Sequence, residues 1–149
     1  IFTLLGMWFI DRAGRKKLMY IGSVVYIISL AAIAFYFHQD IQSSSLSVFL
    51  FLFIAAHAIG QGTVIWVFMA EIFPTELRAS GQALGSSVHW ILAALIPSAI
   101  PYLFSMIGAA AVFITFTCFM LLQLLWVHFY MPETKDSSLE EIEESLMSN

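Results

Sequence analysis

The sequence predicts an all-α membrane protein, because it is too apolar for a water-soluble domain and its apolar residues fall into helix-length runs. The mean hydropathy of the 149 residues is +0.89, and 60% of them are hydrophobic. Only 11% are charged, whereas soluble domains carry about 25%. This composition leaves too few polar groups to cover a surface in water, so the predicted solvent is lipid.

Residues 1–10 are predicted to form the last half of a membrane helix, and residues 11–17 a basic loop. The apolar run from Ile1 ends at Asp11, and four of the next six residues are Arg or Lys. Because the chain starts inside this run without a signal-peptide pattern, we expect it to be a fragment of a longer protein. Its expected partners are therefore the lipid bilayer and the N-terminal helices of the same protein.

Four complete crossings are predicted after this loop, since a helix needs about 20 apolar residues to span roughly 30 Å of hydrocarbon. They are expected at residues 18–37, 48–73, 81–104 and 109–130, joined by loops at 38–47, 74–80 and 105–108. Residues 131–149 follow as a tail. Ser137 or Ser138 with Glu140 or Glu141 has capping-box spacing, so the tail is either a short amphipathic helix or a frayed end.

The basic residues predict the orientation of these crossings. All six Lys and Arg residues lie in alternate connections, namely 11–17, 74–80 and 131–149. Since basic loops remain on the cytoplasmic side, these connections and the C-terminus are predicted to be cytoplasmic. The short loops favour the cytoplasmic (inner) membrane of a bacterial cell, with a eukaryotic plasma membrane as the alternative.

Several charges lie at helix ends where the helix dipole disfavours them. Asp11 and Glu71 fall at predicted C-termini, whereas Arg15 and Arg78 fall at predicted N-termini. Pairing between helix ends would remove this conflict. We therefore expect Asp11 and Glu71 to pair with Arg78, Arg12 or Arg15 in a cytoplasmic charge network that can break when helices move.

Four short motifs carry a resemblance to a known family. They are DRAGRK at 11–16, GQGTVIW at 60–66 followed by AEIFP at 70–74, Arg78, and PETK at 132–135. In this order and spacing they resemble the sugar porter family of the major facilitator superfamily. The resemblance implies that the chain runs from the end of helix 8 to helix 12 and the tail, as part of the C-terminal six-helix half of a twelve-helix fold.

The resemblance also implies roles for individual residues. Glu133 of the PETK motif is expected to join the charge network. Gln61 and Thr63 stand where the family usually has proline, so Gly60 and Gly62 are expected to hinge the helix without it. The implied function is transport of a monosaccharide by alternating access.

Candidate substrate contacts lie near the predicted midplane. At about 1.5 Å per residue, His89 and Trp90 lie about 14 Å from the start of their helix, and Gln61 about 18 Å from the end of its own. Amide and imidazole groups suit sugar hydroxyls, and indole faces suit the apolar side of a sugar. The expected contacts are Trp66, His89, Trp90, Gln61, Gly62 and His57. His57 and Gln61, one helical turn apart, either contact substrate or bond each other.

Other functional classes fit the sequence less well. The predicted spans contain no deep nucleophile, metal constellation or carboxylate pair, so neither an enzyme, a metal site nor a cofactor is predicted. No feature indicates a nucleic-acid partner. Alternatives within the membrane are a porter of polyols or organic acids and a non-transporting sugar sensor. Whether protons accompany the sugar is left open.

Overall fold

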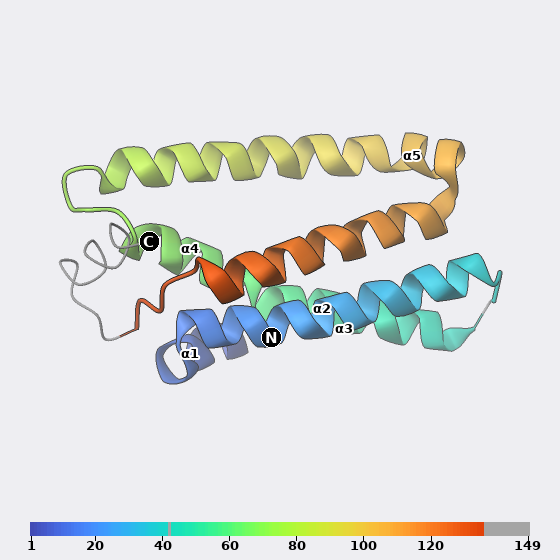
Figure 1. Cartoon of the computed structure of the whole chain (residues 1–149), viewed down its shortest axis with the longest axis horizontal. Coiled ribbons are helices and arrows are strands. Elements are labelled where there is room, and N and C mark those ends of the chain that lie inside the picture. The colour runs from blue at the N-terminus through green and yellow to red at the C-terminus, as the bar shows by residue number, and fades with distance from the viewer. Residues whose placement is uncertain (42, 136–149) are drawn as a thin grey trace.

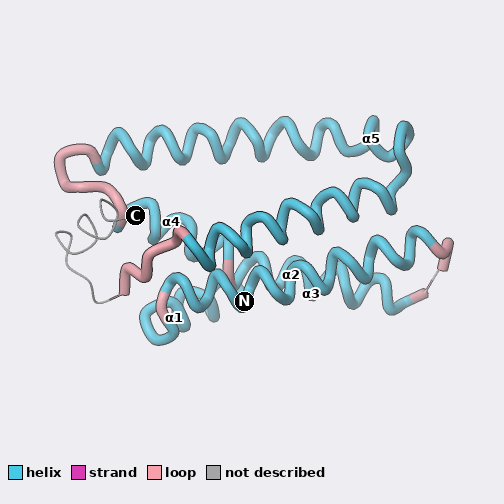
Figure 2. Tube along the Cα trace, viewed as in Figure 1, coloured by secondary structure: helices cyan, strands magenta, loops and turns pink. Residues whose placement is uncertain are grey.

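The computed structural model describes residues 1–41 and 43–135, and the described part of the chain is helical, with no strand (Figure 2). Its helices are α1 (Phe2–Ala13), α2 (Arg15–His38), α3 (Ser44–Ile59), α4 (Gln61–Glu71) and α5 (Arg78–Phe129). Three stretches are long and apolar enough to cross a membrane: α2, α3 with α4, and α5. The predicted all-α membrane fold is therefore confirmed for these residues. The predicted tail helix lies outside the described residues.

Helix α5 is two helical arms joined at a reversal. Its 52 residues would measure about 78 Å if straight, far more than the roughly 30 Å hydrocarbon core. Gly108 has φ 80° and ψ 155°, a conformation open essentially to glycine alone. Figure 1 shows the chain turning back there, so that residues 78–107 and 109–129 run side by side in opposite directions. Residues 105–107, which the sequence places in a loop, continue the first arm.

A second interruption separates α3 from α4. Gly60 has φ −88° and ψ −97°, which is not helical, although the sequence predicts one unbroken span at 48–73. Gly62, the other predicted hinge residue, lies within α4 and follows its helical path. The break is thus confined to one residue, immediately before Gln61.

Helix α2 is the centre of the packing. It lies against α3 and against the second arm of α5. The buried apolar cluster draws on all helices except α3 and includes Ile10, Leu18, Met19, Val64, Phe68, Val127 and Met131. The first arm of α5 contributes nothing to this cluster, and many of its large apolar side chains are exposed, as expected of surfaces that face lipid or other helices.

The ends of the helices gather at two opposite ends of the molecule. The turn between α1 and α2, the loop after α4 and the residues after α5 lie together at one end (Figure 1). Residues 39–41 and the reversal of α5 lie at the other. The three basic segments therefore share one end.

Candidate functional site

Arg15 and Glu71 form the strongest ion pair of the described residues. Arg15 is the first residue of α2 and Glu71 the last of α4. The Arg15 Nη2 and Nε atoms donate to the two Glu71 carboxylate oxygens at 2.6 and 3.0 Å. This two-pronged geometry is the strong form of the pair, and only 11% of the Arg15 side chain is exposed.

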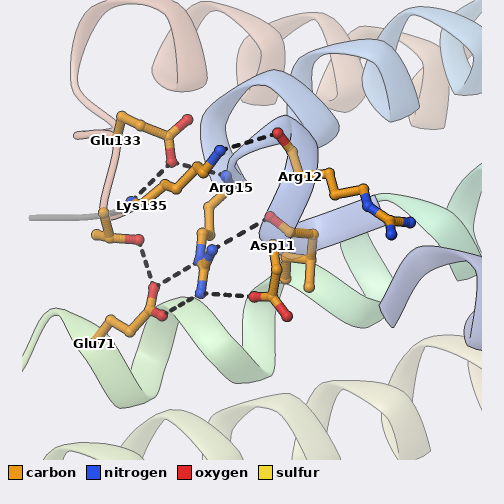
Figure 3. A network of polar contacts seen from close by, with 8 residues as sticks. Asp11, Arg12, Arg15, Glu71, Glu133 and Lys135 are labelled. Carbon is orange, nitrogen blue, oxygen red and sulfur yellow. Dashed lines mark hydrogen bonds and ion pairs between the residues drawn. The ribbon is translucent and has the colours of Figure 1, made fainter. Parts of the chain in front are cut away.

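Other groups complete the surroundings of this pair. Arg15 Nη1 donates to the Ile10 carbonyl at 3.3 Å, near the C-terminus of α1, where a cation is favoured. The Thr134 hydroxyl donates to Glu71 at 2.5 Å. Asp11 lies 3.4 Å from Arg15, but its side chain is 76% exposed, so water screens this contact. The cluster, shown in Figure 3, joins α1, α2, α4 and the residues after α5.

Glu133 caps the start of α2. Its carboxylate accepts hydrogen bonds from the backbone N–H groups of Arg15 at 2.8 Å and Lys16 at 3.1 Å. The first N–H groups of a helix lack partners within it, and a negative charge there is favoured by the helix dipole. The capping carboxylate therefore offsets the unfavourable position of Arg15 at an N-terminus. Lys135 reinforces this end by donating its Nζ to the Arg12 carbonyl at 3.0 Å.

Gly14 permits this capping arrangement. Its φ is 88°, and a Cβ atom built on it would lie 2.5 Å from a Glu133 carboxylate oxygen. A side chain at this position would therefore strain the backbone and displace the carboxylate. The turn between α1 and α2 and the Glu133 contact thus depend on the same glycine.

The side chains of two predicted members form no ion pair in this cluster. The Arg12 guanidinium stacks over the Trp8 ring, 3.6 Å from its centroid. The Arg78 Nε is buried and has no hydrogen-bond partner among the described residues. Of the arginines that the sequence offers as partners, Arg15 contacts both Asp11 and Glu71.

Trp66, His89 and Trp90 form an aromatic cluster between α4 and the first arm of α5. The Trp66 ring centroid lies 5.0 Å from that of His89 and 6.4 Å from that of Trp90. His89 and Trp90 lie 5.4 Å apart. Both indoles keep accessible surface, 39% for Trp66 and 64% for Trp90. The cluster therefore offers an open apolar face beside an imidazole.

His57 lies beside this cluster, on the wall of a largely apolar cavity of about 700 Å³ that His89 also lines. The other lining residues come from α2, α3 and both arms of α5, and include Tyr26, Phe53, Ile96, Pro97, Phe104 and Phe113. Gly62 packs against His57, since a Cβ built on Gly62 would lie 3.3 Å from the His57 Nε2. His57 and His89 thus share one cavity.

Gln61 points away from the aromatic cluster. Its amide Nε2 donates to the Ser23 hydroxyl of α2 at 3.0 Å, and the residue is only 9% exposed. The structure therefore connects Gln61 to Ser23 instead of to His57, the bonding partner that the sequence offers. Neither Ser23 nor Thr134 is singled out by sequence reasoning. Serines are common on membrane helices, and only the motif spacing around 132–135 draws attention to Thr134.

The described residues contain no group of three or more His, Cys, Asp or Glu side chains placed to hold a metal ion. The available chemistry is therefore hydrogen bonding and stacking at the aromatic cluster, and ion pairing at one end of the molecule.

Comparison with known proteins finds one family model, described as "Sugar (and other) transporter", that matches residues 1–146. The arabinose-proton symporter of Bacillus subtilis is 36% identical over 144 residues, covering 96% of this chain and 31% of that protein. The facilitated trehalose transporter Tret1 of Aedes aegypti is 30% identical over 155 residues, covering 99% of this chain and 19% of that protein.

A solved structure has the same arrangement of helices. The inward-open xylose transporter XylE from E. coli superimposes with a TM-score of 0.86 and 27% sequence identity, covering 97% of this chain and 32% of that one. The chain thus spans about a third or less of the length of these relatives.

Proposed function

The chain belongs to the sugar (and other) transporter family of the major facilitator superfamily, and from this premise we propose that the whole protein carries a monosaccharide across a membrane by alternating access. The family consists of transporters, not enzymes. In this proposal residues 1–135 run from the end of helix 8 to just beyond helix 12 of a twelve-helix protein, and the remaining helices complete the substrate path.

The observation that carries the proposal is the aromatic cluster. Trp66 and Trp90 supply apolar ring faces, and His89 supplies a hydrogen-bonding group at their junction. A sugar has both a hydroxyl-bearing edge and an apolar C–H face, so it needs both kinds of contact. Because these rings come from α4 and α5, relative movement of the two helices would assemble or open the site.

The charge cluster supports the proposed conformational cycle. Arg15, Glu71 and Thr134 connect three segments at the basic end of the molecule. We propose that this end faces the cytoplasm, together with the C-terminus, and that the cluster is closed in one conformation and broken in another.

Uptake into liposomes containing the whole protein tests this function. Labelled arabinose, xylose and glucose are the probes, each with and without an imposed proton gradient. We expect saturable uptake of at least one sugar, accelerated by an inward proton gradient if the protein resembles its symporter relatives. Trp66→Ala should lower uptake at low sugar concentration about tenfold, because loss of a stacking face near 1.4 kcal/mol has that effect.

Trp126→Ala is the matched control, since Trp126 lies on the second arm of α5 and its ring contacts Phe68, not the rings of the aromatic cluster. It should retain uptake. Sugar binding without flux would indicate a sensor, and equal loss in both variants would show that Trp66 has no special role.

A further inference from the structure

A polar cluster lies within the apolar packing of α2, α4 and the second arm of α5. The Ser23 hydroxyl accepts hydrogen bonds from the Gln61 amide at 3.0 Å and from the Gln123 amide at 3.3 Å. The same hydroxyl donates to the Met19 carbonyl at 2.8 Å. Ser23 is completely buried. One hydroxyl therefore joins three membrane helices.

This cluster lies at the break between α3 and α4. A Cβ atom built on Gly22 would lie 3.0 Å from the Gly60 Cα and 3.1 Å from the Gln61 Oε1, so the α2 backbone presses directly against the break. The break also frees a carbonyl, that of Ala58, which accepts the Thr63 hydroxyl at 2.6 Å. Gln61 is the first residue of α4, so its bond to Ser23 attaches the start of that helix to α2.

Helix α4 is held at both ends, and Trp66 lies midway between them. At one end Gln61 bonds to Ser23, and at the other Glu71 bonds to Arg15. Both anchors are on α2. The position of the Trp66 ring therefore depends on two separate attachments of a short helix of 11 residues.

A glutamine at position 61 is not the residue that would make the fold most stable. Its Oε1 is buried and has no hydrogen-bond partner among the described residues. A buried polar group left unpaired opposes folding, and an apolar side chain of similar size would avoid that penalty. The donated bond to Ser23 gives the amide a positional role that an apolar residue could not fill.

We propose that Gln61, held by Ser23, to which Gln123 also bonds, is a positioning residue that sets the place of Trp66 in the substrate site without touching the substrate. The proposal rests on the transport function proposed above. It differs from the expectation that Gln61 binds sugar, because it assigns the same role to Ser23, which is buried in the contact between helices. Loss of any member of the cluster should then have the same effect, a weaker interaction of the protein with the sugar because Trp66 is displaced.

Transport kinetics of the whole protein distinguish the two roles. Gln61→Leu, Ser23→Ala and Gln123→Leu should each raise the KM for the transported sugar, by about fivefold for Gln61→Leu and Ser23→Ala, the loss expected from one net hydrogen bond. The double variant Gln61→Leu/Ser23→Ala should be no worse than either single change. Turnover per folded molecule should change less than KM, whereas mere loss of folded protein would lower the maximal rate alone.

The matched controls remove a side-chain amide and a side-chain hydroxyl that lie outside the polar cluster. Gln39 is an exposed amide at the far end of α2, and Ser98 is an exposed hydroxyl that donates to a carbonyl of its own helix. Gln39→Leu and Ser98→Ala should leave KM unchanged. An effect of Gln61→Leu that Ser23→Ala does not share would overturn the proposal and restore Gln61 as a substrate contact.

A second measurement tests positioning without relying on transport. Trp66→Cys is introduced into the whole protein after all other cysteines are replaced, and its labelling rate by a water-soluble thiol reagent is measured. Adding Gln61→Leu or Ser23→Ala should change this rate severalfold, whereas Gln39→Leu or Ser98→Ala should not. Unchanged labelling overturns the inference even if the unaltered protein transports sugar. Changed labelling, with no flux through the unaltered protein, would overturn only the transport function.

Discussion

Two glycines of this chain have positive φ but lie in different surroundings. Gly14 and Gly108 have nearly the same backbone conformation, with φ 88° and 80° and ψ 158° and 155°. Their surroundings differ. A Cβ built on Gly14 meets the Glu133 carboxylate, whereas one built on Gly108 meets nothing within 4 Å. Substitutions at the two positions can therefore be compared to separate the cost of backbone strain from the cost of losing a specific contact.

Replacing each glycine with alanine makes this difference measurable. Gly108→Ala should cost about 1–3 kcal/mol from backbone strain alone. Gly14→Ala should cost the same plus the loss of the Glu133 cap, roughly another 1 kcal/mol. Thermal unfolding of the purified whole protein in detergent would rank them. A larger loss for Gly108→Ala would show that Glu133 contributes no stability at the α2 N-terminus.

At the scale of helices, α2 is the element to which the others are attached. Glu133 caps its first turn, Glu71 of α4 pairs with Arg15, and Gln61 reaches Ser23 further along. The sequence could predict that oppositely charged helix ends meet, because each end alone carries an unfavourable sign. It could not select Arg15 over Arg78, because that choice depends on how far the helices are offset and rotated when they pack.

The direction of the Gln61 side chain could not be predicted from the sequence for a similar reason. Counting residues along a helix gives depth in the membrane, and depth grouped Gln61 with His89 and Trp90. The direction of a side chain around the helix depends on the local backbone, and the break at Gly60 interrupts the helical path immediately before Gln61. Trp66, His89 and Trp90 do lie together, because α4 and the first arm of α5 are neighbours at this point.

Removing one charge of the cluster should weaken the attachment of α4 to α2. Glu71→Gln leaves the mostly buried Arg15 guanidinium without its main counterion, which should lower stability by about 1–3 kcal/mol. It should also raise the rate at which a thiol reagent that enters from the basic end of the molecule labels a cysteine placed near Trp66. Thermal unfolding and thiol labelling provide the two measurements.

Asp11→Asn is the control for this change, because its exposed carboxylate contributes little to the pair. Its unfolding temperature should stay within a degree or two of the unaltered protein. If Asp11→Asn were as harmful as Glu71→Gln, total charge at this end, and not the specific pair, would be the relevant quantity.

At the scale of the whole molecule, the helix ends divide into a basic and a non-basic end. Composition and loop charges predicted this division, because charged groups avoid hydrocarbon whatever the details of packing. The arrangement of the α5 arms could not be predicted as closely. The first arm is little covered by the described residues, so few contacts within them hold it in place.

Sidedness in living cells can be measured with two single cysteines. Ser44→Cys lies at the start of α3, and Thr75→Cys in the loop after α4. A membrane-impermeant thiol reagent added outside should label Ser44→Cys and leave Thr75→Cys unlabelled until the cells are opened. The reverse pattern would place the basic end outside and contradict the proposed orientation.

The glycine reversal within α5 has a consequence for biosynthesis. From Ala79 to Phe129 the chain contains no Lys, Arg, Asp or Glu, so nothing at the tip opposes its passage through the bilayer. The two arms can therefore leave the ribosome and enter the membrane together as one helical hairpin. The lysine and glutamate residues that follow would remain on the side from which the hairpin inserts, and would keep its open end there.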